Sequence, residues 1–178
     1  MTASKPKHIS IREATTSTDT AFIISCFDSA LPYLASIGSK GQWGTELFSE
    51  RQWFCDEIRG FVEGDRDLAT GIAWIADVED ENDGHGETRP AGAMVLTTTG
   101  HQAPQSVLPP VKELYVKFLI TDRRLEAVSK GVGACLLDFA KDFTRKQSIK
   151  LLRVDCWSGG NGGLVKYVPS WTFCLWTD

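Results

Sequence analysis

The sequence contains few of the residues that bind metals or form disulfides. It has three histidines and five cysteines, and no two cysteines are spaced as CxxC. Every cysteine lies in an apolar run away from the histidines, which favours buried free thiols over a disulfide framework or a zinc site. We therefore expect no metal site.

The sequence also lacks the long apolar segments and basic stripes that mark other classes of protein. No apolar run approaches the roughly 20 residues that a membrane helix needs. The first residues, MTASKPKHISIREA, lack the apolar core of a secretory signal. The net charge is −4, and lysine and arginine form no stripe interleaved with aromatic residues. We therefore expect a cytoplasmic protein with no nucleic-acid or membrane partner.

The sequence does contain enough apolar material for one core. The chain has 178 residues, of which 42% are hydrophobic. That length supports one sizeable domain and is too short for two ordinary domains with a linker. We therefore expect a single domain over residues 1–178.

Five segments have the composition of β-strands. Apolar residues that alternate with polar ones, or run together between polar loops, predict strands at 8–14, 71–78, 91–99, 113–121 and 150–157. The second and third of these are joined by the polar loop 79–90, which predicts a hairpin. Residues 113–121, ELYVKFLIT, form the most strand-like run in the chain.

Two helices are expected between the first two strands. Residues 17–20, STDT, offer N-caps ahead of apolar residues at helical spacing. Ser49 followed by Gln52 matches a capping box for a second helix, and the glycine-rich residues 37–48 predict the loop between the two helices. The predicted order along the chain is β-α-α-β-β-β-α-β.

The third predicted helix follows two glycines that are one residue apart, in KGVGACLLDFAKDF, residues 130–143. The apolar residues recur at helical spacing and form one stripe, made of Val132, Cys135, Leu136, Phe139, Ala140 and Phe143. This stripe predicts an amphipathic helix that begins near Gly131 and packs on a sheet.

The glycine pair, Gly131 and Gly133, has two interpretations. Glycines at a helix N-terminus remove the Cβ atoms that would keep a diphosphate away from the unpaired N–H groups, and Lys130 adds a positive charge there. Alternatively, the glycines only permit a tight turn into the helix. A P-loop is excluded because the lysine precedes the glycines, and a dinucleotide fold places its glycines in the first βαβ unit.

The succession of strand, glycine loop, amphipathic helix and strand resembles the GNAT superfamily of N-acetyltransferases. The loop signature of that superfamily is Gln or Arg, two residues, Gly, one residue, then Gly or Ala. Gly131 and Gly133 match its glycines. Val128 stands at the Gln or Arg position, where Arg123 and Arg124 are the alternative cations.

Two further markers of the resemblance lie outside the glycine loop. Asn161 and Phe173 have the separation of a marker that follows the next strand in many superfamily members. Gln42 and Trp43 resemble a QW pair in a subgroup of small-molecule acetyltransferases, where the pair belongs to the substrate-binding loop.

The resemblance implies an α/β (α+β) fold with a mixed, mostly antiparallel twisted sheet flanked by helices, in the order β-α-α-β-β-β-α-β-α-β. The chain stops at Asp178, which implies a truncated form that lacks the final closing strand. A second copy is a candidate to cover the open sheet edge, giving a homodimer. The implied cosubstrate is acetyl-CoA, and its implied binding residues are Leu119, Ile120, Thr121, Lys130, Gly131, Val132, Gly133, Ala134 and Asn161.

The resemblance also implies candidates for acid–base chemistry. Glu113 and Asp155 fall on strands that line the acceptor cleft in the superfamily, so either is a candidate base. The alternatives are a surface position for Glu113 and, for Asp155, an ion pair with Arg153 or a cap on the following loop. Tyr167 is the candidate acid, although the superfamily's tyrosine position falls on Val168, and a place in the core is its alternative.

Several tryptophans are candidates to wall an acceptor pocket, because an aromatic face attracts a cationic amine. The alternative for Trp43, Trp53, Trp74 and Trp157 is ordinary packing in the core. Together these features predict an N-acetyltransferase that acts on a small-molecule amine by direct attack in a ternary complex. A catalytically impaired CoA-binding or regulatory protein of the same fold is the alternative.

Overall fold

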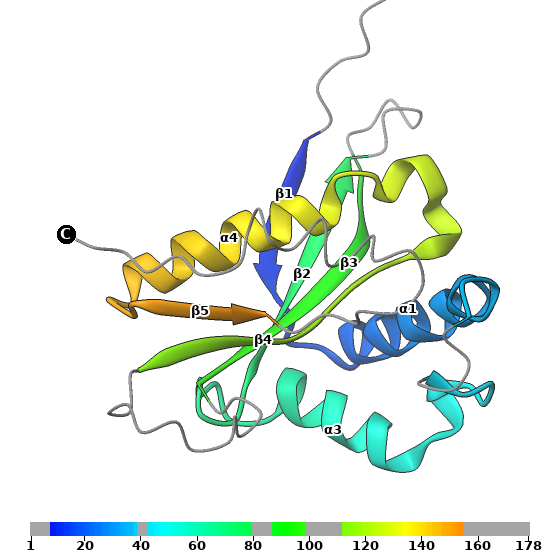
Figure 1. Cartoon of the computed structure of the whole chain (residues 1–178), viewed down its shortest axis with the longest axis horizontal. Helices are drawn as coiled ribbons and strands as arrows, with labels where there is room; N and C mark the ends of the chain where they lie inside the picture. Colours follow the sequence, from blue (N-terminus) through cyan, green and yellow to red (C-terminus); the bar gives the residue numbers. More distant parts are fainter. Residues whose placement is uncertain (1–7, 39–42, 80–86, 99–111, 155–178) are drawn as a thin grey trace, which may run out of the picture.

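The computed structural model describes residues 8–38, 43–79, 87–98 and 112–154 (Figure 1). The elements, in chain order, are β1 (Ile9–Glu13), α1 (Ser17–Ser36), η1 (Phe48–Glu50), α3 (Gln52–Glu63), β2 (Ile72–Glu79), β3 (Thr88–Thr97), β4 (Glu113–Thr121), η2 (Arg123–Ser129), α4 (Val132–Lys146) and β5 (Leu151–Val154). This order confirms the predicted one as far as β5, with two 3₁₀ helices added. The helix and strand expected after β5 lie outside the described residues.

The five strands form one sheet in the order β1-β2-β3-β4-β5. Neighbouring strands are antiparallel from β1 to β4, whereas β4 and β5 are parallel. The parallel pair is joined by η2 and α4, as a crossover connection requires. The sheet is therefore mixed and mostly antiparallel, as the resemblance implied.

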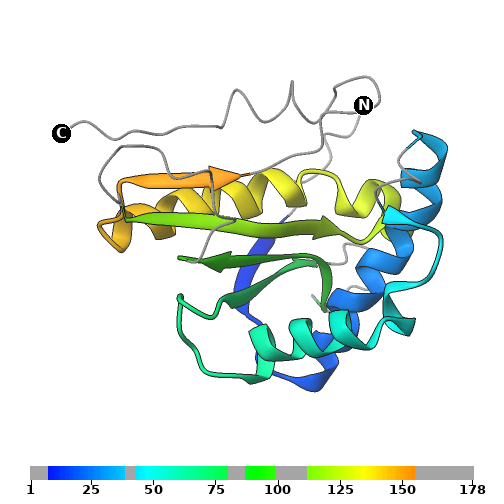
Figure 2. The same cartoon turned by 60° about the horizontal axis from the view of Figure 1, so that its bottom comes forward.

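The helices cover the sheet from both sides, with α1 and α3 on one face and α4 on the other (Figure 2). Ile23, Phe27 and Ile58 pack against Ala73 and Ile75 on the first face. On the second face, the predicted α4 stripe packs on the sheet through its buried members Val132, Leu136 and Ala140.

A polar cluster fixes the start of α1. The N-cap is Thr16, one residue before the predicted STDT, and its Oγ1 accepts from Asp19 N while Asp19 Oδ2 accepts from Thr16 N, which completes a capping box. Arg12 then joins Asp19 on α1 to Asp77 on β2, with Nη2 and Nε donating at 2.9 and 2.7 Å. The cluster ties β1, α1 and β2 together.

The capping box predicted for the second helix is wrong. Ser49 lies in η1, and α3 begins at Gln52 after Arg51, which makes no side-chain cap. The reason is a contact across the fold: Asp28 Oδ1 on α1 accepts from the N–H groups of Phe48 and Ser49, at 2.6 and 3.3 Å. Those bonds hold the residues before α3 in a separate turn.

The third strand begins earlier than the sequence predicted. β3 starts at Thr88, so it includes residues that we assigned to the hairpin loop. The pairing with β2 shifts between Ala76 and Asp77, where Asp77 pairs with Pro90. Proline cannot donate a ladder hydrogen bond, and a bulge is a place in a sheet where it is tolerated.

None of the helices in the described ranges is long and apolar enough to cross a membrane.

Candidate functional site

The glycine loop enters α4 through a left-handed residue. Gly131 is the N-cap of α4, with φ +87°, and a Cβ built on it would meet no atom within 4 Å. The conformation, and not crowding by the protein, is therefore what requires glycine at this position. The conformation of Gly131 and the open space beside it are compatible with both interpretations of the glycine pair, a phosphate site and a simple tight turn into the helix.

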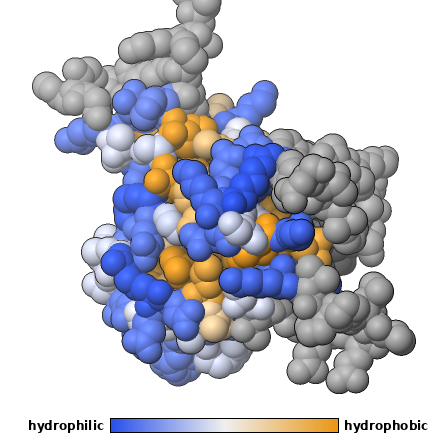
Figure 3. All heavy atoms as spheres, turned by 90° about the vertical axis from the view of Figure 1, so that its left-hand side faces the viewer, coloured by the Kyte–Doolittle hydropathy of each residue, from blue (hydrophilic) through white to orange (hydrophobic). Residues whose placement is uncertain are grey.

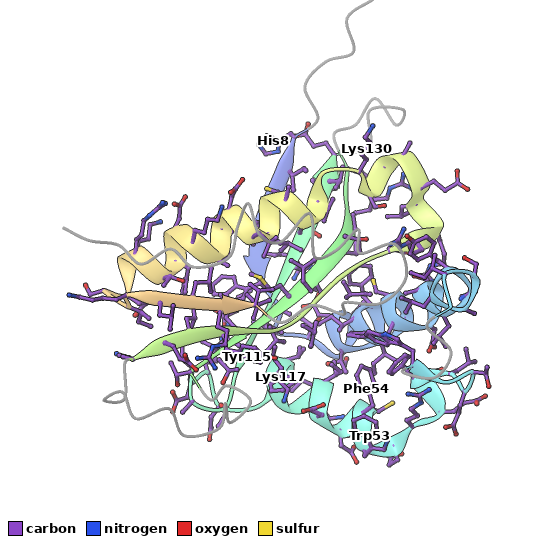
Figure 4. All side chains as sticks on the ribbon, in the orientation of Figure 1. His8, Trp53, Phe54, Tyr115, Lys117 and Lys130 are labelled. Atoms are coloured by element: carbon purple, nitrogen blue, oxygen red, sulfur yellow. The ribbon has the colours of Figure 1, made fainter. Side chains whose placement is uncertain are left out.

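Unpaired N–H groups lie directly after this turn. The first backbone hydrogen bond of α4 runs from Cys135 N to Gly131 O at 3.0 Å. The N–H groups of Val132, Gly133 and Ala134 therefore precede the helical ladder, at the end where the helix dipole is positive. Gly131 and Lys130 are exposed at this end, and Lys130 is labelled there in Figure 4. The end can accept an anion.

The first turn of α4 sits very close to the sheet. A Cβ on Gly92 of β3 would come within 2.7 Å of Val132 Cγ1 and 2.9 Å of Ile120 O, which no real side chain does. A Cβ on Gly133 would instead make an ordinary contact of 3.5 Å with Leu119 Cδ2. Internal packing therefore demands glycine at 92 and does not demand it at 133.

A β-bulge interrupts β4 in front of this helix end. Val95 pairs with Phe118 and Leu96 pairs with Val116, so Lys117 is the extra residue. Val116 packs in the core between the sheet and α4. Lys117 forms an ion pair with Glu57 of α3, and Phe118 packs on the side of the sheet that α1 and α3 cover. The bulge thus places Lys117 and Phe118 on one face of the sheet.

β5 separates from β4 at the bulge. Their parallel pairing ends at Val116↔Val154, so no strand among the described residues borders that side of residues 117–121. The predicted cofactor residues Leu119, Ile120 and Thr121 all lie in this stretch and are half-buried. Their strand edge leads to the N-terminus of α4, so the open edge and the unpaired helix N–H groups are contiguous.

The two loop arginines lie against α1. Arg124 donates to Asp122 and to Ser25 Oγ of α1. The guanidinium of Arg123 lies over the ring of Tyr33, 3.9 Å from its centroid. Neither guanidinium is directed at the glycine loop. Lys130 is therefore the cationic side chain that the loop itself contributes.

The candidate base Glu113 lies at the far end of β4 from the glycine loop. Its Oε2 accepts from Arg153 Nη2 on β5 at 2.9 Å, and its side chain is 20% exposed. The same face of β4 carries Tyr115 and Lys117, which Figure 4 shows beside α3. Figure 3 views the molecule from the side on which β4 starts, where polar residues surround small apolar patches. Glu113 is therefore half-buried and already paired.

The tryptophans do not gather around one pocket. Trp43 packs on the rings of Phe27 and Phe48. Trp53 is 64% exposed on α3, so it is not a core residue. Trp74 lies on the opposite face of the sheet, against Phe139 and Phe143 of α4. Core packing is thus the role of Trp74, and Trp43 is a core residue at the edge of the α1 and α3 layer.

Several predicted site residues lie outside the described residues. These are Gln42, Asp155, Asn161, Tyr167, Val168 and Phe173, together with Trp157. The cysteines inside the described ranges, Cys26, Cys55 and Cys135, are all free. Burial raises the pKa of the Cys26 thiol, which suits a packing role. No cluster that could hold a metal ion occurs among the described histidine, cysteine and carboxylate side chains.

Sequence reasoning missed Gly92, the Lys117 bulge and the contact of Arg124 with Ser25. Gly92 stands alone between two alanines, and an isolated glycine in a strand was a signal for a close backbone approach. The bulge and the Arg124 contact gave no local signal, because both depend on residues far away in the chain.

No protein-family model and no curated protein matches the sequence, but solved structures share its fold. A GNAT-family acetyltransferase from Listeria monocytogenes aligns with a TM-score of 0.57 and 20% identity, over 92% of this chain and 84% of that one. A GCN5-related N-acetyltransferase from Ralstonia eutropha gives 0.51 and 14%, over 96% and 97%. AAC(6')-Iy, in complex with the bisubstrate analog CoA-S-monomethyl-acetylneamine, gives 0.55 and 9%, over 96% and 95%.

The alignments extend over nearly the full length of the chain, and they agree with the mixed sheet and the strand, glycine loop and helix described above. On these alignments the chain has the fold of the GNAT N-acetyltransferases.

Proposed function

We propose that the protein transfers an acetyl group from acetyl-CoA to the amine of a small molecule. The observation that carries this proposal is the continuity of the open β4 edge, residues 117–121, with the unpaired N–H groups of Val132, Gly133 and Ala134. The helix end suits a pyrophosphate, and the strand edge offers backbone groups to an extended chain that carries a thioester. Asn161 completes the proposed cofactor set.

The proposed reaction is direct attack. The amine nitrogen bonds to the thioester carbonyl carbon, the carbon–sulfur bond breaks, the nitrogen loses a proton and the thiolate gains one. A backbone N–H group of the open β4 edge, at Leu119 or Ile120, polarises the carbonyl oxygen, because neighbouring N–H groups of a strand point to opposite edges. Glu113 is the proposed base within the described residues. It lies six residues along β4 from Leu119, about 20 Å in an extended strand, so it takes the proton through a chain of water molecules. Arg153 must share or release the carboxylate for that role.

The other proposed groups complete the site. Asp155 is the alternative base and Tyr167 is the proposed acid for the departing thiolate. Gln42 and Trp43 are the proposed acceptor contacts. AAC(6')-Iy, which shares the fold, binds a bisubstrate analog in which CoA is linked to acetylneamine, and this supports a small amine as the kind of acceptor.

A second function is favoured by a specific observation. Val128 stands at the superfamily's cation position, and the nearby arginines are engaged by Asp122, Ser25 and Tyr33. Such a loop weakens the contacts with the cofactor phosphates, and Val168 stands where the superfamily has its catalytic tyrosine. Together these departures favour a CoA-binding or regulatory protein without efficient turnover.

Two measurements separate these functions. Thermal unfolding with millimolar acetyl-CoA tests binding, since a ligand that prefers the native state raises Tm. Thiol release is then measured over a panel of small amines. Stabilisation with turnover supports the acetyltransferase, stabilisation without turnover supports the binding protein, and the absence of any stabilisation contradicts both.

A further inference from the structure

A cluster of polar contacts joins the η2 loop to α1. Arg124 Nε and Nη2 donate to the two carboxylate oxygens of Asp122, each at 2.8 Å, and Nη2 also donates to Ser25 Oγ at 2.9 Å. The backbone N–H of Arg123 donates to Ser29 Oγ at 3.1 Å. These contacts connect the loop before α4 to a helix on the other face of the sheet.

The two serines are oriented by α1 itself. Ser25 Oγ donates to Phe22 O at 2.8 Å, and Ser29 Oγ donates to Cys26 O at 2.7 Å. Ser25 therefore uses its hydroxyl proton within the helix, whereas the Ser29 hydroxyl also interacts with the carboxylate of Asp122. The oxygen lone pairs of both serines remain acceptors for the loop. The helix thus presents two fixed acceptors one turn apart.

Asp122 links this cluster to the sheet. It is 4% exposed, its N–H donates to Ala91 O at 2.9 Å, and its carboxylate accepts from Arg124 N at 2.9 Å. Burial works to raise the pKa of Asp122, but the hydrogen bonds and charge of Arg124 outweigh it and hold the pKa below its usual value. A buried carboxylate needs such a partner, and Arg124 supplies it from a side chain that is 56% exposed.

The loop between this cluster and the glycine turn is held partly by Leu125 and Val128, which are half-buried against the core on the α4 side of the sheet. No residue of η2 is buried, and Glu126 within it has φ 40° and ψ −110°, a conformation that is unfavourable for a residue with a Cβ. Strained backbone persists only where the surrounding contacts fix it. The polar anchor of the loop is Arg124 at its start, and the apolar anchors are Leu125, Val128 and, at its end, Val132, which packs on Gly92.

We infer that Arg124 and Ser25 are positioning residues, which hold the η2 loop on α1 and thereby set the place of Lys130 and Gly131 for cofactor phosphates. The inference rests on the proposed function, because phosphate binding is what the position serves. Arg124 acts here through the loop and is not itself a phosphate ligand. Its guanidinium is engaged by Asp122 and Ser25.

The test removes the acceptors on α1 and leaves the loop sequence unchanged. The double variant Ser25→Ala, Ser29→Ala loses both contacts with η2 and keeps the Arg124–Asp122 pair. Ser36→Ala is the matched control, since Ser36 Oγ makes the same kind of bond, to Tyr33 O at 2.7 Å, and has no contact with η2. Amide hydrogen exchange of residues 123–131 is measured without ligand. Acetyl-CoA affinity is then measured by calorimetry, and kcat and KM by thiol release.

We expect the double variant to exchange faster over residues 123–131 than the control. Its Kd and KM for acetyl-CoA should rise about three- to tenfold with kcat unchanged, as expected when only ground-state binding is weakened. Unchanged exchange, or faster exchange with unchanged affinity, would overturn the inference. A lower Tm than that of Ser36→Ala without a change in KM would show that Ser25 has only a structural role. That result would also overturn the inference. If the unchanged protein binds no acetyl-CoA, the proposed function fails, and the inference fails with it.

Discussion

Gly92 of β3 lies directly beneath Val132, the first residue of α4, so closely that a Cβ on Gly92 would come within 2.7 Å of Val132 Cγ1. This contact fixes the height of the helix end above the sheet. The unpaired N–H groups that we assign to the cofactor phosphates therefore owe their position to a glycine on a different strand.

Replacing Gly92 with alanine should displace the N-terminus of α4. The new methyl group meets Val132 on one side and Ile120 O, a backbone atom, at 2.9 Å on another. We expect a loss of about 1–3 kcal/mol in the free energy of unfolding, typical of overpacking, and weaker acetyl-CoA binding. Urea unfolding and calorimetric titration measure the two effects.

Gly60→Ala is the matched control for that change. Gly60 lies inside α3, and a Cβ on it would meet nothing within 4 Å. Alanine there should raise stability by about 0.5–1 kcal/mol through helix propensity and leave acetyl-CoA binding unchanged. Equal effects of the two substitutions would show that the Gly92–Val132 contact does not position the helix.

Glu113→Gln should lower turnover if Glu113 is the base. The amide keeps the size of the side chain and its ability to accept from Arg153, but it cannot take a proton from the amine. We expect kcat to fall by about 10²-fold or more at neutral pH, with little change in the KM for acetyl-CoA. Initial rates of thiol release give both constants.

Glu57→Gln is the control for the loss of a carboxylate. Glu57 on α3 pairs with Lys117 of β4 at 2.9 Å, so it is also a paired, half-exposed carboxylate near β4. It should retain turnover close to that of the unchanged protein. If the two variants are equally active, Glu113 is not the base, and Asp155 is the remaining candidate.

Asp19 should make stability depend on pH. Burial works to raise the pKa of this carboxyl, but hydrogen bonds from Arg12 and from the N–H groups of Thr15 and Thr16 lower it to about 2. The folded pKa lies below the unfolded value, so this stability is fully present above about pH 4 and is lost as the pH falls toward 2. We expect the loss to be about 2 kcal/mol, measured by urea unfolding across that range.

Asp19→Asn should remove most of this dependence. The variant should be less stable at neutral pH and should lose less stability between pH 4 and pH 2 than the unchanged protein. Asp138→Asn is the control, because Asp138 is 60% exposed on α4, where its ion pair with Lys141 contributes little. Parallel stability curves for the unchanged protein and Asp19→Asn would contradict this role.

Much of the fold could be predicted because its signals are local. The run Glu113–Thr121 is rich in β-branched and aromatic residues, and the observed β4 has the same bounds as the prediction. The stripe that begins at Val132 gave the helix, its start and the face that it buries. Each signal lies within the segment that it describes.

The features that complete the site depend on distant residues and were not predicted. The bulge at Lys117 arises from the register with β3, which the β4 sequence does not contain. Ser49 resembles a helix cap, but Asp28 on α1 captures its N–H and places it in η1. Arg124 was a candidate phosphate ligand by its position in the loop, and its contact with Ser25, 99 residues away, is visible only in the fold.

The proposed phosphate site, formed by residues 130–134 at the start of α4, is tested most directly at Gly133. A Cβ there makes only an ordinary contact with Leu119, and the superfamily's loop signature accepts alanine at this position, so Gly133→Ala should fold and bind as the unchanged protein does. Leucine is an equally good helix former, but its larger side chain would extend over Leu119 and Thr121, across the proposed path of the cofactor. The pair therefore separates folding from cofactor binding.

The decisive measurement is a calorimetric titration of acetyl-CoA into the unchanged protein, Gly133→Ala and Gly133→Leu, with the Tm of each recorded without ligand. We predict that the first two bind with similar affinity and that Gly133→Leu, at an equal or higher Tm, does not bind detectably. Binding by Gly133→Leu with unchanged affinity, or no binding by the unchanged protein, would contradict the assignment of this helix end to coenzyme A.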